Sequence, residues 1–88
     1  MSITLTLISK PGCHLCSDAR AVVLGVIDQE PVGSVLLSER SILDDPALFE
    51  RYSEDIPVIL VDGVFHDRYR VDPDRLRSAL AGARAQSR

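Results

Sequence analysis

The segment KPGCHLC, residues 10–16, contains two cysteines separated by two residues, and the rest of the chain is organised around it. It follows a short apolar run, Ile3–Ile8, and opens a segment with helical periodicity. If Cys13 lies at the mouth of that helix and Cys16 one turn inside it, their Cα atoms are about 5 Å apart. A disulfide bond requires a Cα separation of about 4.4–6.8 Å. The spacing therefore predicts two sulfurs at a strand-to-helix junction that can form and break a disulfide bond.

The two cysteines are expected to have different chemical roles. Unpaired backbone N–H groups and the positive end of the helix dipole favour a thiolate at Cys13, which is therefore the predicted nucleophile. Cys16, set back on the helix and less accessible, is placed to attack a mixed disulfide at Cys13 and release the reduced partner. We therefore predict thiol-disulfide exchange with a disulfide-containing protein or a small thiol as the partner.

Length, composition and charge narrow the classes of function. The 88 residues, 45% of them hydrophobic, suffice for one modest core, so we expect a single domain over residues 1–88. No apolar run approaches the roughly 18 residues of a membrane span, and the N-terminus lacks the basic start of a secretory signal. We expect a cytoplasmic protein without a membrane partner. A net charge of −3 with scattered basic residues argues against nucleic acid as a partner.

The pattern along the first half of the chain is strand, helix, strand. Apolar residues at every second position of 3–7 alternate with threonines, and a Pro-Gly pair then ends this strand. Apolar residues from Leu15 to Ile27 fall on one helical stripe, which Pro31 and Gly33 end. A second strand starts at Val35, and the length of the crossover predicts that it is parallel to the first.

The second half predicts a short helix, a hairpin and a final helix. An acidic residue followed by proline begins each helix, at Asp45-Pro46 and at Asp72-Pro73. The apolar run Val58–Val61 suits a buried strand, and Asp62-Gly63 signals a two-residue hairpin turn into Val64-Phe65. The expected order is β-α-β-α-β-β-α, an α/β fold with a four-stranded mixed sheet.

The aromatic residues are expected in the core. Phe49 and Tyr52 lie on the apolar face of the short helix, and Phe65 lies in the hairpin. A peptide-binding surface is the alternative interpretation of the same residues.

This order, with the cysteine motif after the first strand and a proline at the start of the third, resembles the thioredoxin fold in its minimal, glutaredoxin-sized form. Residues 10–16, together with DDP at 44–46 and IPVILVDG at 56–63, resemble the glutaredoxin-like family of small bacterial proteins. The resemblance spans nearly the whole chain. It implies an oxidoreductase that reduces protein or low-molecular-weight disulfides through Cys13 and Cys16. We expect a monomer with no bound cofactor, served by an electron-donating thiol.

The resemblance also implies a cis peptide bond at Ile56-Pro57, facing the cysteines. The backbone of Ile56 then pairs with an extended segment of the partner, and Pro57, which has no N–H, leaves the loop edge free to accept it. Taken by itself, a proline at the first residue of a strand has an ordinary structural explanation. Ile56 and Pro57 are accordingly predicted to bind the substrate.

Lys10 and His14 are predicted to contribute to substrate binding as well. Lys10 matches the basic residue commonly found three positions before the nucleophile in the family, and it adds positive potential. An imidazolium at His14 would stabilise the thiolate, although an exposed histidine is mostly neutral at pH 7. Simple solvation is the alternative for both residues. His66, on the expected edge strand, is interpreted as a surface residue.

The start of the last helix departs from the family pattern. Glutathione-using glutaredoxins usually carry a Gly-Gly pair and polar groups there, whereas this chain has RVDPD at residues 70–74. Acidic side chains at that position compete for the helix N–H groups and repel a glutathione carboxylate. Arg68 and Arg70 supply compensating charge nearby. The electron donor, glutathione or a thioredoxin reductase type of system, stays open.

Two other functions are alternatives on the same fold. A metal or iron-sulfur module would use Cys13 and Cys16 with His14 or His66, but zinc normally requires four ligands and the chain has no second cysteine pair. A cluster shared between two chains is the remaining form of that alternative, and we predict no metal site within one chain. A non-catalytic redox sensor requires the same reactive thiolate as an enzyme.

Overall fold

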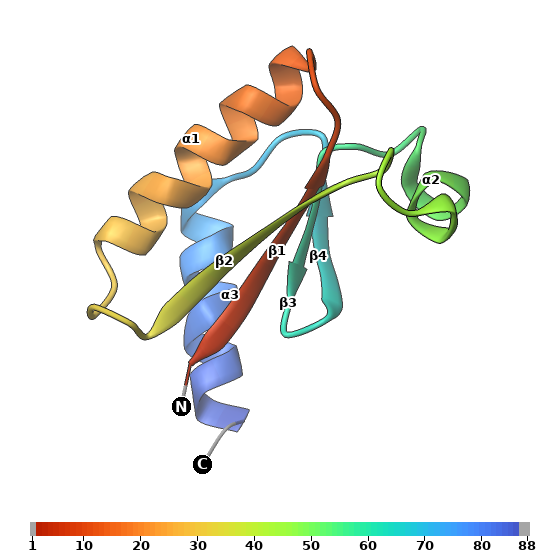
Figure 1. The fold of residues 1–88 in the computed structure, drawn as a ribbon. Helices are drawn as coiled ribbons and strands as arrows, with labels where there is room; N and C mark the ends of the chain where they lie inside the picture. The colour runs from red at the N-terminus through yellow and green to blue at the C-terminus, as the bar shows by residue number, and fades with distance from the viewer. Residues whose placement is uncertain (1, 87–88) are drawn as a thin grey trace.

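The computed structural model describes residues 2–86 and has the expected elements in the expected order (Figure 1). They are β1 (Ile3–Ser9), α1 (His14–Asp28), β2 (Val35–Ser41), α2 (Pro46–Tyr52), β3 (Val58–Val61), β4 (Val64–Arg68) and α3 (Pro73–Gln86). The α/β class and the order β-α-β-α-β-β-α are therefore confirmed. Within residues 2–86, no helix is both long enough and apolar enough to cross a membrane.

The four strands form one mixed sheet in the order β2-β1-β3-β4. β1 and β2 pair in parallel, from Ile3 opposite Val35 to Ser9 opposite Ser41, because α1 crosses over between them. β3 runs antiparallel to both β1 and β4. The tight turn between β3 and β4 contains Asp62 and Gly63, whose φ angles of 48° and 82° are both positive, as such a turn requires.

The two long helices cover one face of the sheet and build the larger of two apolar clusters (Figure 1). Leu76 and Leu80 of α3 and Val23 of α1 are fully buried in it. They meet the side chains that β1, β2 and β3 direct to this face, which are Ile3, Leu5, Leu7, Val35, Ile59 and Val61. This packing fixes the position of α1 on the sheet and hence the position of its N-terminus.

The opposite face of the sheet is covered by α2 at one end only. Ile8 and Val58 point to this face and pack with Ile42, Ile56 and the partly buried side chains of α2. The buried sulfur residue Cys16 belongs to the same cluster. The cysteine motif therefore lies at the end of the sheet where α1, α2 and the start of β3 come together.

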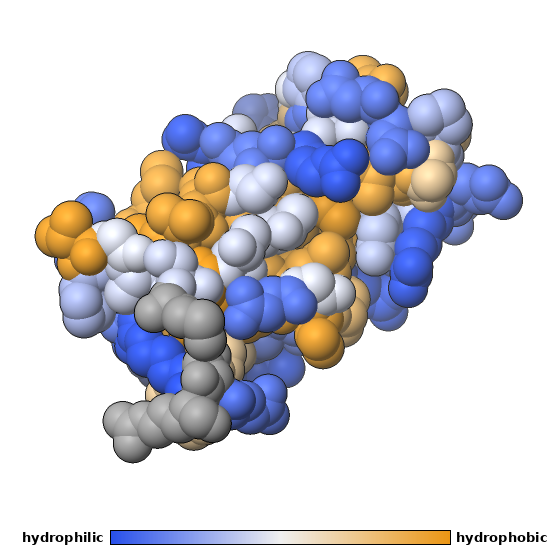
Figure 2. All heavy atoms as spheres, turned by 60° about the horizontal axis from the view of Figure 1, so that its bottom comes forward, coloured by the Kyte–Doolittle hydropathy of each residue, from blue (hydrophilic) through white to orange (hydrophobic). Residues whose placement is uncertain are grey.

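The prediction that the aromatic residues are core residues is wrong for Phe49 and Phe65. These two residues are 50% and 54% exposed, whereas Tyr52 is half-buried against the smaller cluster. None of the seven residues of α2 is buried, because this short helix lies over the edge of its cluster. Phe65 pairs with Leu60 across the hairpin, on the part of the sheet that α2 does not reach. Hydrophobic side chains, interspersed with pale and hydrophilic ones, also lie at the surface of the face drawn in Figure 2.

His66 is also more buried than the surface position expected for it. The pairs Leu60–Phe65 and Ile59–Asp67 leave His66 as an extra residue in β4, which is a β-bulge. His66 shares a hollow with residues of α3, and its Nε2 atom is buried without a hydrogen-bond partner in the described part of the chain. Burial lowers the pKa of His66 below 6.5, and the nearby Arg75 acts in the same direction, while Asp67 opposes it.

Candidate functional site

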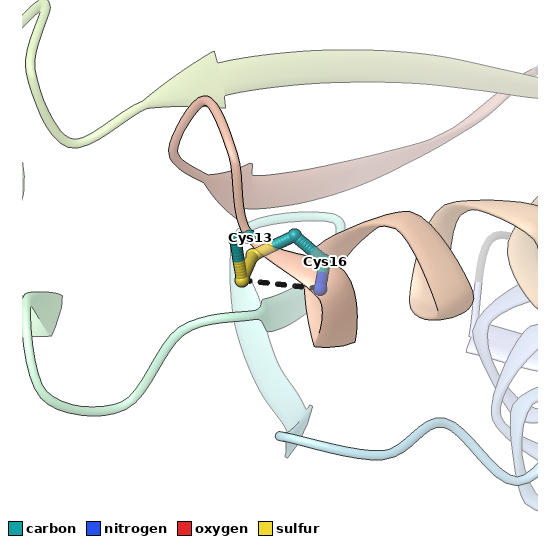
Figure 3. The surroundings of a disulfide bond; sticks show 2 residues. All are labelled: Cys13 and Cys16. Atoms are coloured by element: carbon teal, nitrogen blue, oxygen red, sulfur yellow. Dashed lines mark hydrogen bonds between the residues drawn. A yellow bond between two sulfur atoms is a disulfide. The ribbon is translucent and has the colours of Figure 1, made fainter.

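Cys13 and Cys16 form a disulfide bond at the N-terminus of α1 (Figure 3). Their Cα atoms are 5.2 Å apart, within the range that a disulfide requires. Cys13 is the N-cap of the helix, with extended backbone angles, and its Sγ accepts a hydrogen bond of 3.2 Å from the backbone N–H of Cys16. Once the disulfide is reduced, this N–H and the helix dipole favour negative charge on the sulfur of Cys13.

Cys13 and Cys16 differ in their exposure to solvent. Cys13 is partly exposed at the tip of the helix, whereas Cys16 is only 5% exposed and packs in the cluster of Ile8, Ile56 and Val58. An incoming disulfide can therefore reach Cys13 more easily than Cys16.

The turn before the motif aims the chain from the sheet into the helix. Gly12 has a φ angle of 75°, in the left-handed region that glycine adopts without steric cost. Ser17 then donates its backbone N–H to the carbonyl oxygen of Cys13 at 3.1 Å, which closes the first turn of α1. The position of Cys13 is thus set from both sides by backbone geometry.

Ile56 and Pro57 lie at the same end of the sheet as the cysteines. The peptide bond between them is cis, as the family resemblance implied. Pro57 is fully buried, and Ile56 packs in one cluster with Cys16. The structure therefore brings together four of the residues predicted from the sequence.

A network that sequence analysis missed holds the Ile56-Pro57 segment. The backbone N–H of Tyr69 donates to the carbonyl oxygen of Pro57 at 2.8 Å, and the Tyr69 hydroxyl donates to the carbonyl oxygen of Glu54 at 3.1 Å. Arg68 forms an ion pair of 2.8 Å with Asp55, and its guanidinium lies 5.0 Å from the centre of the Tyr69 ring. Tyr69 has a left-handed φ of 65°, and no local sequence signal indicated this conformation.

Lys10 lies beside the cysteine motif, in a hollow of about 190 Å³ that both cysteines line. Arg20 and Glu39 line the same hollow and form an ion pair of 2.6 Å. Arg20 follows Cys16 by four residues, so helical spacing could have indicated that it lies near the cysteines. The position of Glu39 could not be predicted in this way, because it depends on the register of β2. His14, the first residue of α1, is exposed.

The structure offers few side chains that could together bind a metal ion. Across residues 2–86, no group of three or more His, Cys, Asp or Glu side chains lies close enough together to hold a metal ion. His66, considered above as a further ligand, lines a hollow with residues of α3 and of the hairpin rather than with the cysteines.

Comparison with known proteins places this site in a family. The model of the family described as glutaredoxin-like domain (DUF836) matches residues 4–81. The chain belongs to this glutaredoxin-like family. The match includes the cysteine motif and the Ile56-Pro57 segment, and it stops within α3.

Individual relatives agree with this assignment. The glutaredoxin-like protein YDR286C homolog of Dictyostelium discoideum is 26% identical over 78 residues, which are 85% of this chain and 72% of the relative. The crystal structure of protein XcR50 from X. campestris has a TM-score of 0.70 at 28% identity, covering 89% of this chain and 96% of that one. A mutant thioredoxin from Halobacterium salinarum has a TM-score of 0.67 at 17% identity, covering 92% and 74% of the two chains. The last comparison shows the thioredoxin fold alone, and together they support a redox role for a glutaredoxin-like chain with a Cys-Xaa-Xaa-Cys pair.

Proposed function

We propose that this glutaredoxin-like protein is a thiol-disulfide oxidoreductase that works by a dithiol mechanism. The observation that carries the proposal is the unequal burial of two cysteines joined at a helix N-terminus, with Cys16 at 5% exposure behind a partly exposed Cys13. Membership of the glutaredoxin-like family supports the same chemistry. The partner is a disulfide-containing protein or a low-molecular-weight disulfide.

The reaction has two exchange steps. The thiolate of Cys13 attacks one sulfur of the partner disulfide, forms a mixed disulfide and releases the other sulfur of the partner as a thiolate, which takes up a proton. Cys16 then loses its proton and attacks the sulfur of Cys13, which releases the second partner thiol and closes the Cys13–Cys16 disulfide. The partner gains two electrons and the protein dithiol loses two. A donor thiol, glutathione or another, reverses these steps on the protein.

Four further residues are assigned to substrate binding. The backbone of Ile56 pairs with an extended segment of the partner, and Pro57 leaves that edge free because it has no N–H. Lys10 contributes positive potential beside the cysteines, which favours thiolates. His14, next to the nucleophile, adds positive charge when it is protonated.

The working form that we propose is simple. One domain spanning residues 1–88 acts as a monomer, and the reaction requires no bound cofactor because both electrons come from the two thiols. A reducing compartment such as the cytoplasm suits a dithiol that must be regenerated after each turnover.

Single cysteine variants test the assigned roles. We expect Cys13→Ser to abolish exchange with a disulfide substrate, because the attacking sulfur is gone. We expect Cys16→Ser to accumulate a mixed disulfide at Cys13, detected by mass, because no second thiol can resolve it. The double variant serves as the blank. Equal reactivity of the two single variants would contradict the assignment.

A second measurement separates an enzyme from a sensor. The purified protein is equilibrated with glutathione buffers and, in a parallel series, with a thioredoxin system, while the Cys13–Cys16 disulfide is followed by mass. Multiple turnovers of disulfide reduction per protein molecule are expected for the enzyme, with whichever donor supports them. A single stoichiometric oxidation without turnover in both series would favour the sensor.

A further inference from the structure

A second hollow, of about 210 Å³, lies between α1 and the segment that joins β4 to α3. That segment runs alongside the first turns of α1 (Figure 1). The hollow is lined by Leu15, Asp18, Ala19, Val22, Tyr69, Arg70 and Val71. The four residues from α1 are spaced so that they share one face of the helix, which differs from the face that carries Cys16 and Arg20. The N-terminal end of α1, with Cys13 at its tip, therefore separates this hollow from the one that contains Lys10.

Five of the seven residues that line this hollow are apolar or aromatic, two are charged, and the hollow is partly open to solvent. Leu15 and Tyr69 are each 39% exposed, although Leu15 belongs to the apolar stripe that the sequence predicts for the core. Val71 and Ala19 are buried and form the floor. Asp18 and Arg70 are exposed and carry opposite charges, so the charged groups of the lining cancel. The lining thus has no net charge, and its other five side chains offer apolar contacts to a bound group.

The hollow adjoins the proposed redox site through two of its lining residues. Leu15 is one of the two residues between Cys13 and Cys16. Tyr69 donates its backbone N–H to the carbonyl oxygen of Pro57 at 2.8 Å. A partner segment that pairs with Ile56 and presents a sulfur to Cys13 therefore passes close to the opening of the hollow.

The size of the hollow favours one side chain over a whole small molecule. Pockets for small molecules are typically about 300–1,000 Å³, and this hollow of about 210 Å³ falls below that range. An aliphatic side chain projecting from an extended backbone requires less room than such a ligand.

The start of α3, at the end of the same segment, offers no free N–H group to an anion. Asp72 accepts hydrogen bonds from the backbone N–H groups of Asp74 at 2.8 Å and Arg75 at 3.3 Å through one carboxylate oxygen. Leu76 donates to the backbone carbonyl oxygen of Asp72 at 3.0 Å, and Pro73 has no N–H. The first turn of α3 is therefore already capped by the chain itself, and a partner's carboxylate would meet the charge of Asp72.

We infer that the hollow is a specificity pocket for an apolar side chain that flanks the cysteine of a polypeptide disulfide. The inference rests on the proposed function and names its substrate class, which is an extended polypeptide with an aliphatic residue beside its cysteine, in preference to glutathione disulfide. Burial of the apolar side chain in the hollow strengthens binding of such a partner. An anionic tripeptide gains no comparable interaction, because the N–H groups at the start of α3 are already capped.

Matched peptides test this preference. The fully reduced protein is mixed with symmetrical disulfides of blocked pentapeptides, Gly-Xaa-Cys-Xaa-Gly, in which Xaa is leucine, serine or aspartate. The rate of formation of the Cys13–Cys16 disulfide is measured by acid quench and mass, and each rate is divided by the rate of the same peptide with dithiothreitol. We expect the leucine peptide to react about tenfold faster than the serine peptide, since burial of part of a leucine side chain has an effect of this size. The aspartate peptide and glutathione disulfide are expected to be slower than the leucine peptide.

Two variants locate the preference in the hollow. Val22→Phe fills the hollow from a position about two and a half turns along α1 from Cys13, and Leu15→Ser removes one apolar wall. Each is expected to reduce the leucine-to-serine ratio towards one. Val32→Phe is the matched control, because Val32 is fully exposed outside the hollow and its replacement should keep the ratio. Far-ultraviolet circular dichroism checks the fold of each variant, and Leu15→Ser alone decides the question if Val22→Phe does not fold.

The outcomes are distinct. Equal corrected rates for the leucine and serine peptides would overturn the pocket while leaving the exchange chemistry intact. So would a corrected rate for glutathione disulfide that equals that of the leucine peptide, or a preference that survives in Leu15→Ser. If the protein reacts neither with any peptide nor with bis(2-hydroxyethyl) disulfide, the proposed function itself fails and the pocket with it.

Discussion

At the scale of single residues, the burial of one nitrogen atom links His66 to the stability of the protein. Nε2 of His66 is buried without a hydrogen-bond partner in residues 2–86, so the folded state disfavours a second proton on the ring. The charged groups facing it are Asp67 on its own strand and Arg75 on α3, which form an ion pair of 3.1 Å with each other. Desolvation is the largest influence, and the pKa of His66 is lowered from 6.5.

This burial predicts a loss of stability in mild acid. The unfolded state takes up a proton at a pKa of about 6.5, while the folded state resists it, so the contribution of His66 is complete above that pH. As the pH falls below about 6.5, the free energy of unfolding decreases until the folded-state pKa is reached. Urea unfolding at pH 7.5, 6.5 and 5.5 should show a shallower decline in His66→Gln than in the wild type. Parallel curves for His66→Gln and the wild type would refute the effect.

The sequence identified some residues of the site and could not identify others, for a physical reason. Cys13, Cys16 and Gly12 are determined by local geometry, because a turn and the first turn of a helix suffice to place them. The role of Tyr69 depends on its contact with Pro57, which lies in a different part of the chain, and on a left-handed φ that tyrosine rarely adopts. Contacts of this kind arise only when the sheet has formed.

At the scale of secondary structure elements, α2 and α3 begin with the same local device but are held in place differently. The Asp45 side chain accepts a hydrogen bond of 2.9 Å from the backbone N–H of Ala47 at the start of α2. Asp72 caps α3 in a similar way. α3 is also anchored by two fully buried leucines, whereas α2 has no buried residue. The cap therefore contributes a larger share of the stability of α2 than of α3.

Replacement of the two capping residues should therefore have different consequences. Each of Asp45→Ala and Asp72→Ala removes a cap worth about 1 kcal/mol. We expect Asp45→Ala to speed amide hydrogen exchange within α2 by about fivefold with little change in the core, because α2 can open locally. Asp72→Ala should instead lower the free energy of global unfolding, because α3 separates from the core only when the protein unfolds. Slower or unchanged exchange in α2 of Asp45→Ala would contradict this difference.

The difference between local capping and burial by tertiary packing also explains which predictions about helices and strands were confirmed. Proline after an acidic residue marked the first turn of both helices correctly, because capping is a local interaction. The burial of Phe49 was predicted wrongly, because burial depends on how much of the sheet the seven-residue helix α2 covers. Likewise, the hairpin turn at Asp62-Gly63 was predicted correctly, but the bulge at His66 inside the same hairpin was not.

At the scale of the whole molecule, the sheet joins two apolar clusters of unequal size. The larger one involves α1, α3 and three strands, and it includes neither cysteine. The smaller one contains Cys16 and reaches Cys13 at its edge. The disulfide is thus connected to the part of the core that contributes less buried apolar surface, and most of the hydrophobic stabilisation is independent of it.

The protein should therefore remain folded when its disulfide is reduced. The bond closes a ring between residues only three apart in sequence, and the chain-entropy model assigns such a short loop about 2 kcal/mol. We expect the reduced protein to keep its far-ultraviolet circular dichroism spectrum and to lose about 2 kcal/mol or less of its free energy of unfolding. Urea unfolding with and without a phosphine reductant measures the difference, and Cys13→Ala/Cys16→Ala, which cannot form the bond, should respond equally in both conditions.

This independence is also what a dithiol mechanism requires of the fold. A protein that alternates between dithiol and disulfide must present Ile56 and Pro57 to its partner in both states, and those residues are held by Tyr69 and by the smaller cluster rather than by the sulfur bond alone. If reduction instead unfolded the chain, the disulfide would be a structural element, and the reduced protein could not attack a partner from an ordered helix N-terminus. The unfolding curves of the reduced protein thus bear on stability and on mechanism at once.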